Sequence, residues 1–113
     1  MPIPNADLAF IPGDKLAGYL LDEQHPVGGS KARWFRSVGY EIDVPAVLEQ
    51  DLLKLVQTSD DFQEKASAFG IKYIVRGKIS TPSGNDANVT TVWIVEPTDN
   101  RPRLVTAFPG DKP

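Results

Sequence analysis

The spacing of apolar residues changes once along the chain, near Gly70, and this change limits the fold more than any other feature. Before it, apolar residues recur at helical spacing, as Leu48, Leu52 and Leu55 do. After it, they alternate with polar residues, as in the segment from Lys72 to Ser80. A helical period followed by a strand period predicts an α+β fold, in which the helices pack on one face of a sheet.

Four helices are predicted in the first part of the chain. They span residues 14–22, 31–38, 45–57 and 61–69. Asp14 and Ser30 are residue types that cap helices, and Pro45 suits a first helical turn. Gly39 and Gly70 follow the predicted ends of the second and fourth helices, where glycine commonly stops a helix.

Three strands are predicted in the last part of the chain, at residues 72–80, 89–96 and 103–108. Short connections rich in turn-forming residues join them, so a three-stranded antiparallel meander is the expected topology. In the first of these strands, Tyr73 and Val75 occupy one face and Arg76 lies on the other. If the helices cover the Tyr73 face, the Arg76 face would be open. The whole chain, residues 1–113, is expected to form one domain.

Composition excludes several classes of function. The chain has no cysteine, which excludes disulfides, thiol catalysis and cysteine-based zinc sites. Its net charge is −3, so nucleic-acid binding would have to depend on a local basic patch. No export signal is recognised and no apolar run approaches the roughly 20 residues that span a bilayer, so a cytoplasmic location is expected. Motifs for the common cofactors are missing, and no cofactor is predicted.

The stretch from Gln24 to Tyr40 contains the clearest candidate site. It includes the only histidine, His25, and contains no acidic residue in a chain that is acidic overall. Its three cations are Lys31, Arg33 and Arg36. Ser30 and Lys31 fall at the predicted start of a helix, where backbone N–H groups and the helix dipole favour an anion. We therefore expect this stretch to bind an anion.

Other interpretations of these residues stay open. The segment from Gly28 to Lys31 resembles the end of a phosphate-binding loop, but no strand precedes it, so it could be an ordinary turn. A histidine before a proline could be a simple loop residue. Arg101, Arg103 and the other strand cations could serve only to protect a solvent-exposed sheet face. One histidine and no cysteine do not form a usual nitrogen/sulfur metal site, so no metal is predicted.

Six segments together resemble a small bacterial family of unknown function. They are ADL–KL–GYLL (Ala6 to Leu21), HPVGGSKARWF (His25 to Phe35), VGY (Val38 to Tyr40), FGIKYIV (Phe69 to Val75), TTVWIV (Thr90 to Val95) and PRLVTAF (Pro102 to Phe108). The family pattern is HPxGxxKAxxF, followed by T-x-W-I and P-R-L-x-T strands. Its members resemble stand-alone genes beside a small partner gene, or tips of secreted contact-dependent toxins. The resemblance implies a toxin-like domain with a cognate antitoxin or immunity protein. This chain departs from the pattern at Gly28-Gly29-Ser30, where many relatives carry more basic residues.

The order of helices followed by a meander is also similar to that of the metal-independent ribonucleases that include barnase, EndoU, colicin ribonucleases and RelE-type toxins. Such enzymes let the RNA 2′-hydroxyl attack the adjacent phosphate, which requires a base, an acid and cations. The similarity implies a catalytic set of His25, Lys31, Arg103 and Thr106 and a substrate- or anion-binding set of Ser30, Arg36 and Thr91. In this set His25 is the general acid or base, while Lys31 and Arg103 hold the phosphate.

Two other functions remain alternatives to a ribonuclease. The chain could be a non-catalytic module that meets a protein partner through its third predicted strand or its basic helix face. It could also bind an anion or nucleotide without turnover, using Ser30 and Lys31. The expected partners are therefore an antitoxin or immunity protein, or RNA, with no membrane contact.

Overall fold

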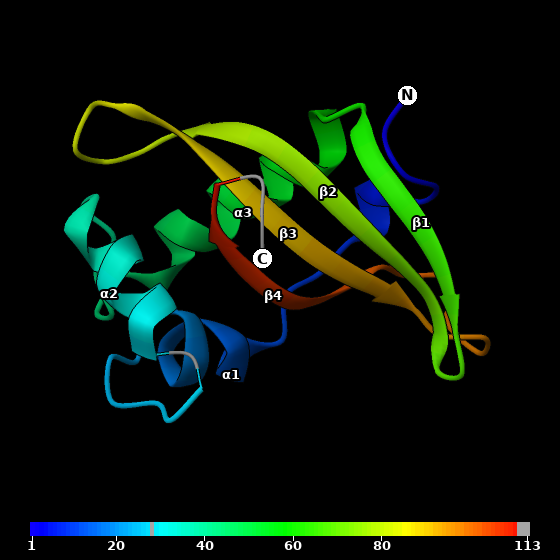
Figure 1. The fold of residues 1–113 in the computed structure, drawn as a ribbon, viewed down its shortest axis with the longest axis horizontal. Coiled ribbons are helices and arrows are strands. Elements are labelled where there is room, and N and C mark those ends of the chain that lie inside the picture. Colours follow the sequence, from blue (N-terminus) through cyan, green and yellow to red (C-terminus); the bar gives the residue numbers. More distant parts are fainter. Residues whose placement is uncertain (28, 111–113) are drawn as a thin grey trace.

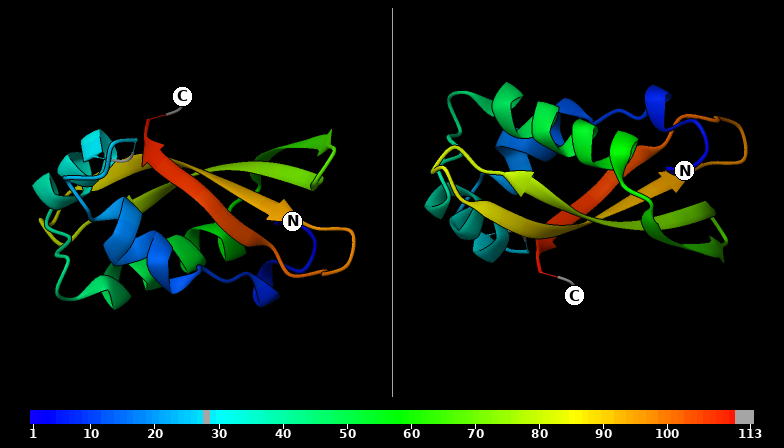
Figure 2. Two further views of the ribbon diagram at one scale, coloured as in Figure 1. Left: turned by 90° about the horizontal axis from the view of Figure 1, so that it is seen from below. Right: turned by 90° about the horizontal axis from the view of Figure 1, so that it is seen from above.

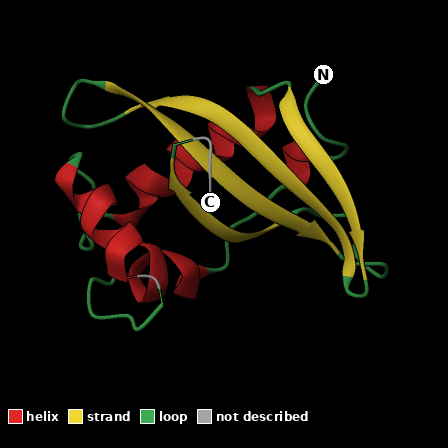
Figure 3. Cartoon of the chain, viewed as in Figure 1, coloured by secondary structure: helices red, strands yellow, loops and turns green. Residues whose placement is uncertain are grey.

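The computed structural model describes residues 1–27 and 29–110, and Figure 1 shows helices packed beside a twisted sheet. The helical elements are η1 (Ala6–Leu8), α1 (Gly13–Lys15), the π-helical turn η2 (Leu16–Leu20), α2 (Gly29–Ser37) and α3 (Pro45–Thr58). The strands are β1 (Asp61–Ser67), β2 (Gly70–Ser80), β3 (Asp86–Val95) and β4 (Arg103–Pro109). The α+β prediction is therefore confirmed, and Figure 3 shows the helices and the sheet as separate parts.

The sheet has four antiparallel strands in the order β1-β2-β3-β4. Each strand pairs with its neighbour in sequence, which is the pattern of a meander. The N-terminal segment lies beside the outer edge of β4. There Phe10 N–H donates to the Pro102 carbonyl at 2.9 Å, and the Phe10 carbonyl accepts from Leu104 N–H at 3.1 Å. This contact covers part of the β4 edge of the sheet.

The predicted fourth helix, at residues 61–69, is wrong, and the predicted count of three strands is wrong with it. These residues form β1 and the turn into β2, with Asp61 opposite Arg76 and Ser67 opposite Gly70. Pairing along the full length of β1 satisfies backbone groups of β2 that would otherwise lie at an edge. Gly70 takes a positive φ of 133° at the turn, so its role is a hairpin turn and not a helix stop.

The other predicted helices are present with shifted ends. Residues 14–22 form α1 and the turn η2, which end at Leu20. The second helix begins at Gly29, so Ser30 lies inside its first turn and does not cap it. The third helix begins at Pro45 as predicted and extends to Thr58. The predicted strands at 72–80, 89–96 and 103–108 correspond to β2, β3 and β4.

Helix α3 covers one face of the sheet, as the views in Figure 2 show. The buried residues of this layer are Leu48, Leu52, Leu55 and Val56 on α3 and Tyr73, Val75, Trp93 and Leu104 on the strands. The covered face is therefore the Tyr73 face, which leaves the Arg76 face open. Lys72 and Lys78 are exposed and Arg76 is half-buried on the opposite, open face.

Helix α3 approaches the sheet closely at Gly77 of β2. A Cβ atom at this position would lie 2.8 Å from Cγ of Leu55. Such a distance is too short for two carbon atoms, so the helix reaches the sheet only because residue 77 has no side chain. Among the described residues, no helix is long and apolar enough to cross a membrane.

We expect Gly77→Ala to lower the free energy of unfolding by about 1–3 kcal/mol, because the added methyl group overpacks the contact with Leu55. Urea denaturation followed by circular dichroism would measure it. Gly13→Ala is the matched control, since no atom lies within 4 Å of a Cβ at that position. The loss in free energy of unfolding caused by Gly77→Ala should be smaller in a Leu55→Ala background. An equal cost in both backgrounds would contradict this explanation.

Candidate functional site

The amine of Lys31 lies at the centre of a small cluster of polar groups. Lys31 Nζ donates hydrogen bonds to the Tyr19 hydroxyl at 2.9 Å and to Thr106 Oγ1 at 3.0 Å. The two hydroxyl oxygens are themselves 3.0 Å apart, which closes a triangle. The three residues come from α2, η2 and β4, so the cluster fixes three separate parts of the chain together. We refer to Lys31, Tyr19 and Thr106 as the Lys31 cluster.

The positive charge of Lys31 is not paired with a carboxylate. None of the ion pairs among the described residues includes it. Its nitrogen instead lies 5.5 Å from the centre of the Tyr19 ring and 5.8 Å from that of Phe108. An ammonium group has three N–H donors, and the two hydroxyl groups accept two of them. A half-buried cation with neutral partners can attract and bind an anionic ligand.

The phenol of Tyr19 is more acidic than that of a tyrosine in water. Burial alone would raise its pKa, but hydrogen bonds with Lys31 and Thr106 and the charges of Lys31 and Lys15 outweigh burial and lower the pKa below 10.0. Lys15 contributes because its Nζ lies 5.1 Å from the centre of the Tyr19 ring. Tyr19 is therefore a better proton donor than an ordinary tyrosine.

His25 lies against the Lys31 cluster. Its ring meets the Tyr19 ring edge to face, with 5.0 Å between the ring centres. His25 Nδ1 accepts a hydrogen bond from Val27 N–H at 3.0 Å, which places the proton of the neutral ring on Nε2. The His25 carbonyl also accepts from Gly29 N–H at 3.0 Å, which ties the loop to the start of α2.

Gly29 allows the loop that carries His25 to approach α2. A Cβ atom at this position would lie 2.7 Å from the Glu23 carbonyl oxygen. The glycine is thus explained by close packing, without any phosphate-loop role. Ser30 is exposed in the first turn of α2, and Gly28 lies outside the described residues.

Arg103 is near the Lys31 cluster on the sheet but forms a different contact. Its guanidinium group pairs with the Glu96 carboxylate at 2.5 Å. In the sheet register Arg103 is opposite Ile94, whereas Thr106 is opposite Val92. Arg103 and Thr106 therefore lie on the same open face, in neighbouring cross-strand rows.

The structure places two of the predicted binding residues away from the Lys31 cluster. Arg36 is exposed and pairs with Glu23 at 2.7 Å. Thr91 is fully buried on the helix-covered face. Its hydroxyl donates to the Val75 carbonyl at 2.9 Å and accepts from Trp93 Nε1 at 2.7 Å. Since this hydroxyl serves the core, we leave Thr91 out of the proposed site.

Tyr19 is the residue of this cluster that sequence reasoning missed. Its spacing from Leu16 and Leu20 predicts an apolar stripe, and both leucines are indeed buried. A tyrosine in such a stripe needs a partner for its hydroxyl. This need is the only feature of the sequence that could have indicated a role for Tyr19 in the site. It does not identify Lys31 or Thr106 as the partner.

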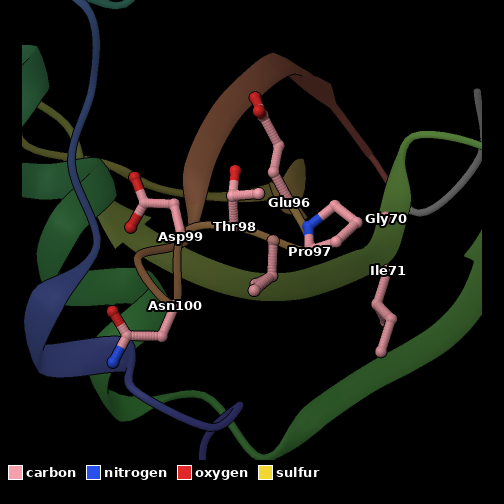
Figure 4. A pocket seen from close by; sticks show the side chains of 8 residues that line it. Gly70, Ile71, Glu96, Pro97, Thr98, Asp99 and Asn100 are labelled. Atoms are coloured by element: carbon pink, nitrogen blue, oxygen red, sulfur yellow. The ribbon is translucent and has the colours of Figure 1, made fainter.

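A surface hollow of about 700 Å³ lies at the far end of the sheet from the Lys31 cluster. Figure 4 shows its lining, which comes from the start of β2 and the connection between β3 and β4. None of the seven residues predicted for the site lines it. Its size alone therefore does not make it the candidate site. Among the described residues no group of three or more His, Asp or Glu side chains could hold a metal ion.

Comparison with known proteins identifies the family of this chain. The family DUF6883, a domain of unknown function, matches residues 2–111, so the chain belongs to it. No curated protein matches the chain. The fold is similar to a chain of the "Contact-dependent growth inhibition toxin - immunity protein complex from Klebsiella pneumoniae 342". That similarity has a TM-score of 0.69 and 18% sequence identity, and it covers 97% of this chain and 100% of the other. At this identity, the similarity establishes the fold alone.

Spectrophotometric titration should show that Tyr19 ionises first among the three tyrosines of the chain. Its pKa is lowered, whereas burial and Asp51 raise the pKa of Tyr40, and burial and Glu64 raise that of Tyr73. Tyr19→Phe should remove the step at lowest pH, and Lys31→Met should move that step to higher pH. Tyr73→Phe is the control and should remove a later step. If the first step survives in Tyr19→Phe, the proposed acidity of Tyr19 is wrong.

Proposed function

We propose that this member of the DUF6883 family is a toxin-like domain that cleaves RNA without a metal and is neutralised by a cognate partner protein. The observation that carries the proposal is the Lys31 cluster, in which an amine without a carboxylate partner lies beside a tyrosine of lowered pKa and a histidine. The fold shared with a chain of a toxin–immunity complex supports the toxin-like part.

The proposed reaction is attack of the RNA 2′-oxygen on the adjacent phosphorus. The new bond from the 2′-oxygen to phosphorus forms while the bond to the 5′-oxygen breaks, which leaves a cyclic phosphate and a 5′-hydroxyl. His25 accepts the proton of the 2′-hydroxyl as the base, on its Nδ1 atom, which must first release the Val27 N–H. Tyr19 donates its proton to the departing 5′-oxygen as the acid, and its lowered pKa suits it to this role.

The cations of the site stabilise the negative charge that builds up on the phosphate oxygens. Lys31 is already oriented by Tyr19 and Thr106, so little reorganisation is needed when the charge develops. Thr106 can turn its hydroxyl toward a bound oxygen. Arg103 remains a proposed phosphate contact in the neighbouring row. Arg36 and Ser30 are proposed as contacts at the rim, although Arg36 would have to leave Glu23 to reach a substrate.

A partner protein that neutralises this activity would have to cover the Lys31 cluster. The cluster lies beside a sheet face that carries Lys72 and Lys78, both exposed. We propose that the partner is an antitoxin or immunity protein with an acidic surface. Charge complementarity of this kind speeds association and selects the partner.

A non-catalytic protein-binding module is the second candidate function. Strand β1 leaves its outer edge open, and six of its seven residues are exposed. Beside it, Phe69 is 75% exposed and Ile71 is 37% exposed. An open edge next to apolar side chains suits pairing with a strand of another protein. A fold shared with the immunity protein of the similar complex would also fit this candidate.

Expression of the chain in a bacterial host under tight induction tests the proposal. The wild type should arrest growth and degrade RNA, as seen on a gel of total RNA. Lys31→Ala should abolish both effects, because loss of a preorganised charge contact costs about 10²–10³-fold in rate. Tyr19→Phe should also reduce cleavage, since it removes the proposed acid. Arg33→Ala is the matched control, an exposed cation on the same helix.

The purified wild-type protein should cleave labelled RNA in excess EDTA. Arg33→Ala should cleave it as well as the wild type does, and Tyr19→Phe and Lys31→Ala should cleave it more slowly. Circular dichroism would confirm that each variant is folded. Normal growth and intact RNA with folded wild-type protein would reject the ribonuclease and favour the binding module. Equal activity of wild type and Lys31→Ala would reject the proposed site.

A further inference from the structure

A cationic hollow lies on the open face beside the Lys31 cluster. It has a volume of about 360 Å³, within the roughly 300–1,000 Å³ range of ligand pockets. Three cations from three different elements line it: Lys15 of α1, Lys72 of β2 and Arg103 of β4. Phe69, at the turn between β1 and β2, also lines it. We call this hollow the Lys72 pocket.

The charge of the Lys72 pocket is positive although the chain is acidic. Among its lining residues, three cations face one carboxylate, Glu96, which leaves a net charge of +2. Glu96 pairs with Arg103. The other two cations, Lys15 and Lys72, belong to none of the ion pairs among the described residues. The chain as a whole carries −3. Such a local reversal of sign selects an anionic ligand.

The sheet register adds a second observation that points to an anion. Lys72 of β2 lies directly opposite Lys65 of β1. On its other side Lys72 is opposite Ile94 of β3, and Ile94 is opposite Arg103 of β4. One cross-strand row therefore carries three cations. Like charges directly opposite each other destabilise a sheet. An anion bound over this row would relieve that repulsion.

The apolar part of the Lys72 pocket suits a flat ring. Phe69 is 75% exposed, and Ile94 and Val105 also line the hollow. Exposed aromatic side chains next to cations are the usual stacking platforms for the bases of single-stranded nucleic acid. The pocket thus combines contacts for a phosphate with contacts for a base, which together describe a nucleotide.

The Lys72 pocket and the Lys31 cluster are close enough for one strand of RNA to occupy both. Arg103 is opposite Ile94 and Thr106 is opposite Val92, so the two sites are two residues apart along β3. Two residues of a strand span about 6.6–6.8 Å. Consecutive nucleotides of one extended strand could therefore lie in the two sites.

We propose that the Lys72 pocket is a nucleotide subsite for single-stranded RNA, next to the phosphate that is cleaved at the Lys31 cluster. Phe69 stacks on the base, and Lys72 and Lys15 bind the phosphate of that nucleotide. Arg103 lies between the two sites and is oriented by Glu96. This proposal rests on the proposed ribonuclease function and names its substrate as an unpaired strand.

Binding of a fluorescently labelled 2′-O-methyl RNA oligonucleotide tests the subsite without cleavage, because the blocked 2′-oxygen cannot attack. Fluorescence anisotropy should show that Phe69→Ala raises the Kd about tenfold or more, as expected for the loss of one base stack. Phe69→Tyr, which keeps a ring, should retain most of the affinity. Val47→Ala is the control, since Val47 is an exposed apolar side chain, 41%, on α3 and lies outside both proposed sites.

Salt dependence tests the phosphate contact. Lys72→Ala should lower the slope of log K against log salt concentration by about 0.7, the value for one phosphate contact on a single strand. Lys54→Ala, an exposed cation on α3, should leave the slope unchanged. A double-stranded RNA of the same sequence should bind more weakly than the single strand, because its bases are not available for stacking.

The outcomes separate this proposal from the ribonuclease proposal. If the wild type does not bind the oligonucleotide, or if Phe69→Ala and Lys72→Ala bind it as the wild type does, the subsite is wrong, whether or not the protein cleaves RNA. If binding depends on both residues but the wild type never cleaves RNA, the ribonuclease proposal fails and the subsite stands as a binding site.

Discussion

Burial of the Tyr73 face of the sheet under α3 is the constraint on which the rest of this structure depends. The alternation along β2 places Tyr73 and Val75 under α3, and Gly77 lets the helix come close enough to exclude water. The residues of β2 that alternate with this layer must then point away from α3. For β2 these residues include Lys72 and Lys78, so the same alternation that builds the core also collects cations on the open face.

The Lys31 cluster depends on a second constraint, which is that the hydrogen-bond partners of Lys31 are neutral hydroxyl groups. A half-buried ammonium group usually pairs with a carboxylate, which neutralises it. Here two hydroxyl groups satisfy its hydrogen bonds and leave its charge in place. The same charge lowers the pKa of Tyr19. One lysine can therefore both attract an anion and prepare a proton donor, and this combination is why we assign a reaction to the cluster and not only binding.

The parts of the fold that the sequence predicts are those with a strong periodic pattern. Helix α3 has a complete apolar stripe, and β2, β3 and β4 have clear strand patterns. Residues 61–69 have neither, because Phe62 is the only residue of β1 that is not exposed. Gln63, Glu64, Lys65 and Ala66 favour a helix by intrinsic propensity. Pairing with β2 overrides that propensity, and a tertiary contact of this kind cannot be read from local sequence.

In the candidate site, too, contacts between residues close in sequence can be predicted, whereas contacts between residues far apart in sequence cannot. His25 and Lys31 belong to one loop and helix, and their proximity can be inferred from the sequence. Lys31 and Thr106 are 75 positions apart, so their contact depends on how α2 packs beside β4. Thr91 and Thr106 are equivalent residue types in predicted strands. Only the choice of buried face decides that Thr91 serves the core.

A β-bulge determines whether Arg103 and Thr106 can act on one substrate. In a regular strand, residues three positions apart point to opposite faces. The register of β3 and β4 shifts between Val92 and Trp93, so that Trp93 is opposite Leu104 but Val92 is opposite Thr106. The extra residue, Val105, returns Thr106 to the face that Arg103 occupies. A sequence pattern of period two would place one of them in the core. The inserted residue is therefore what allows the Lys31 cluster and the Lys72 pocket to share one open surface.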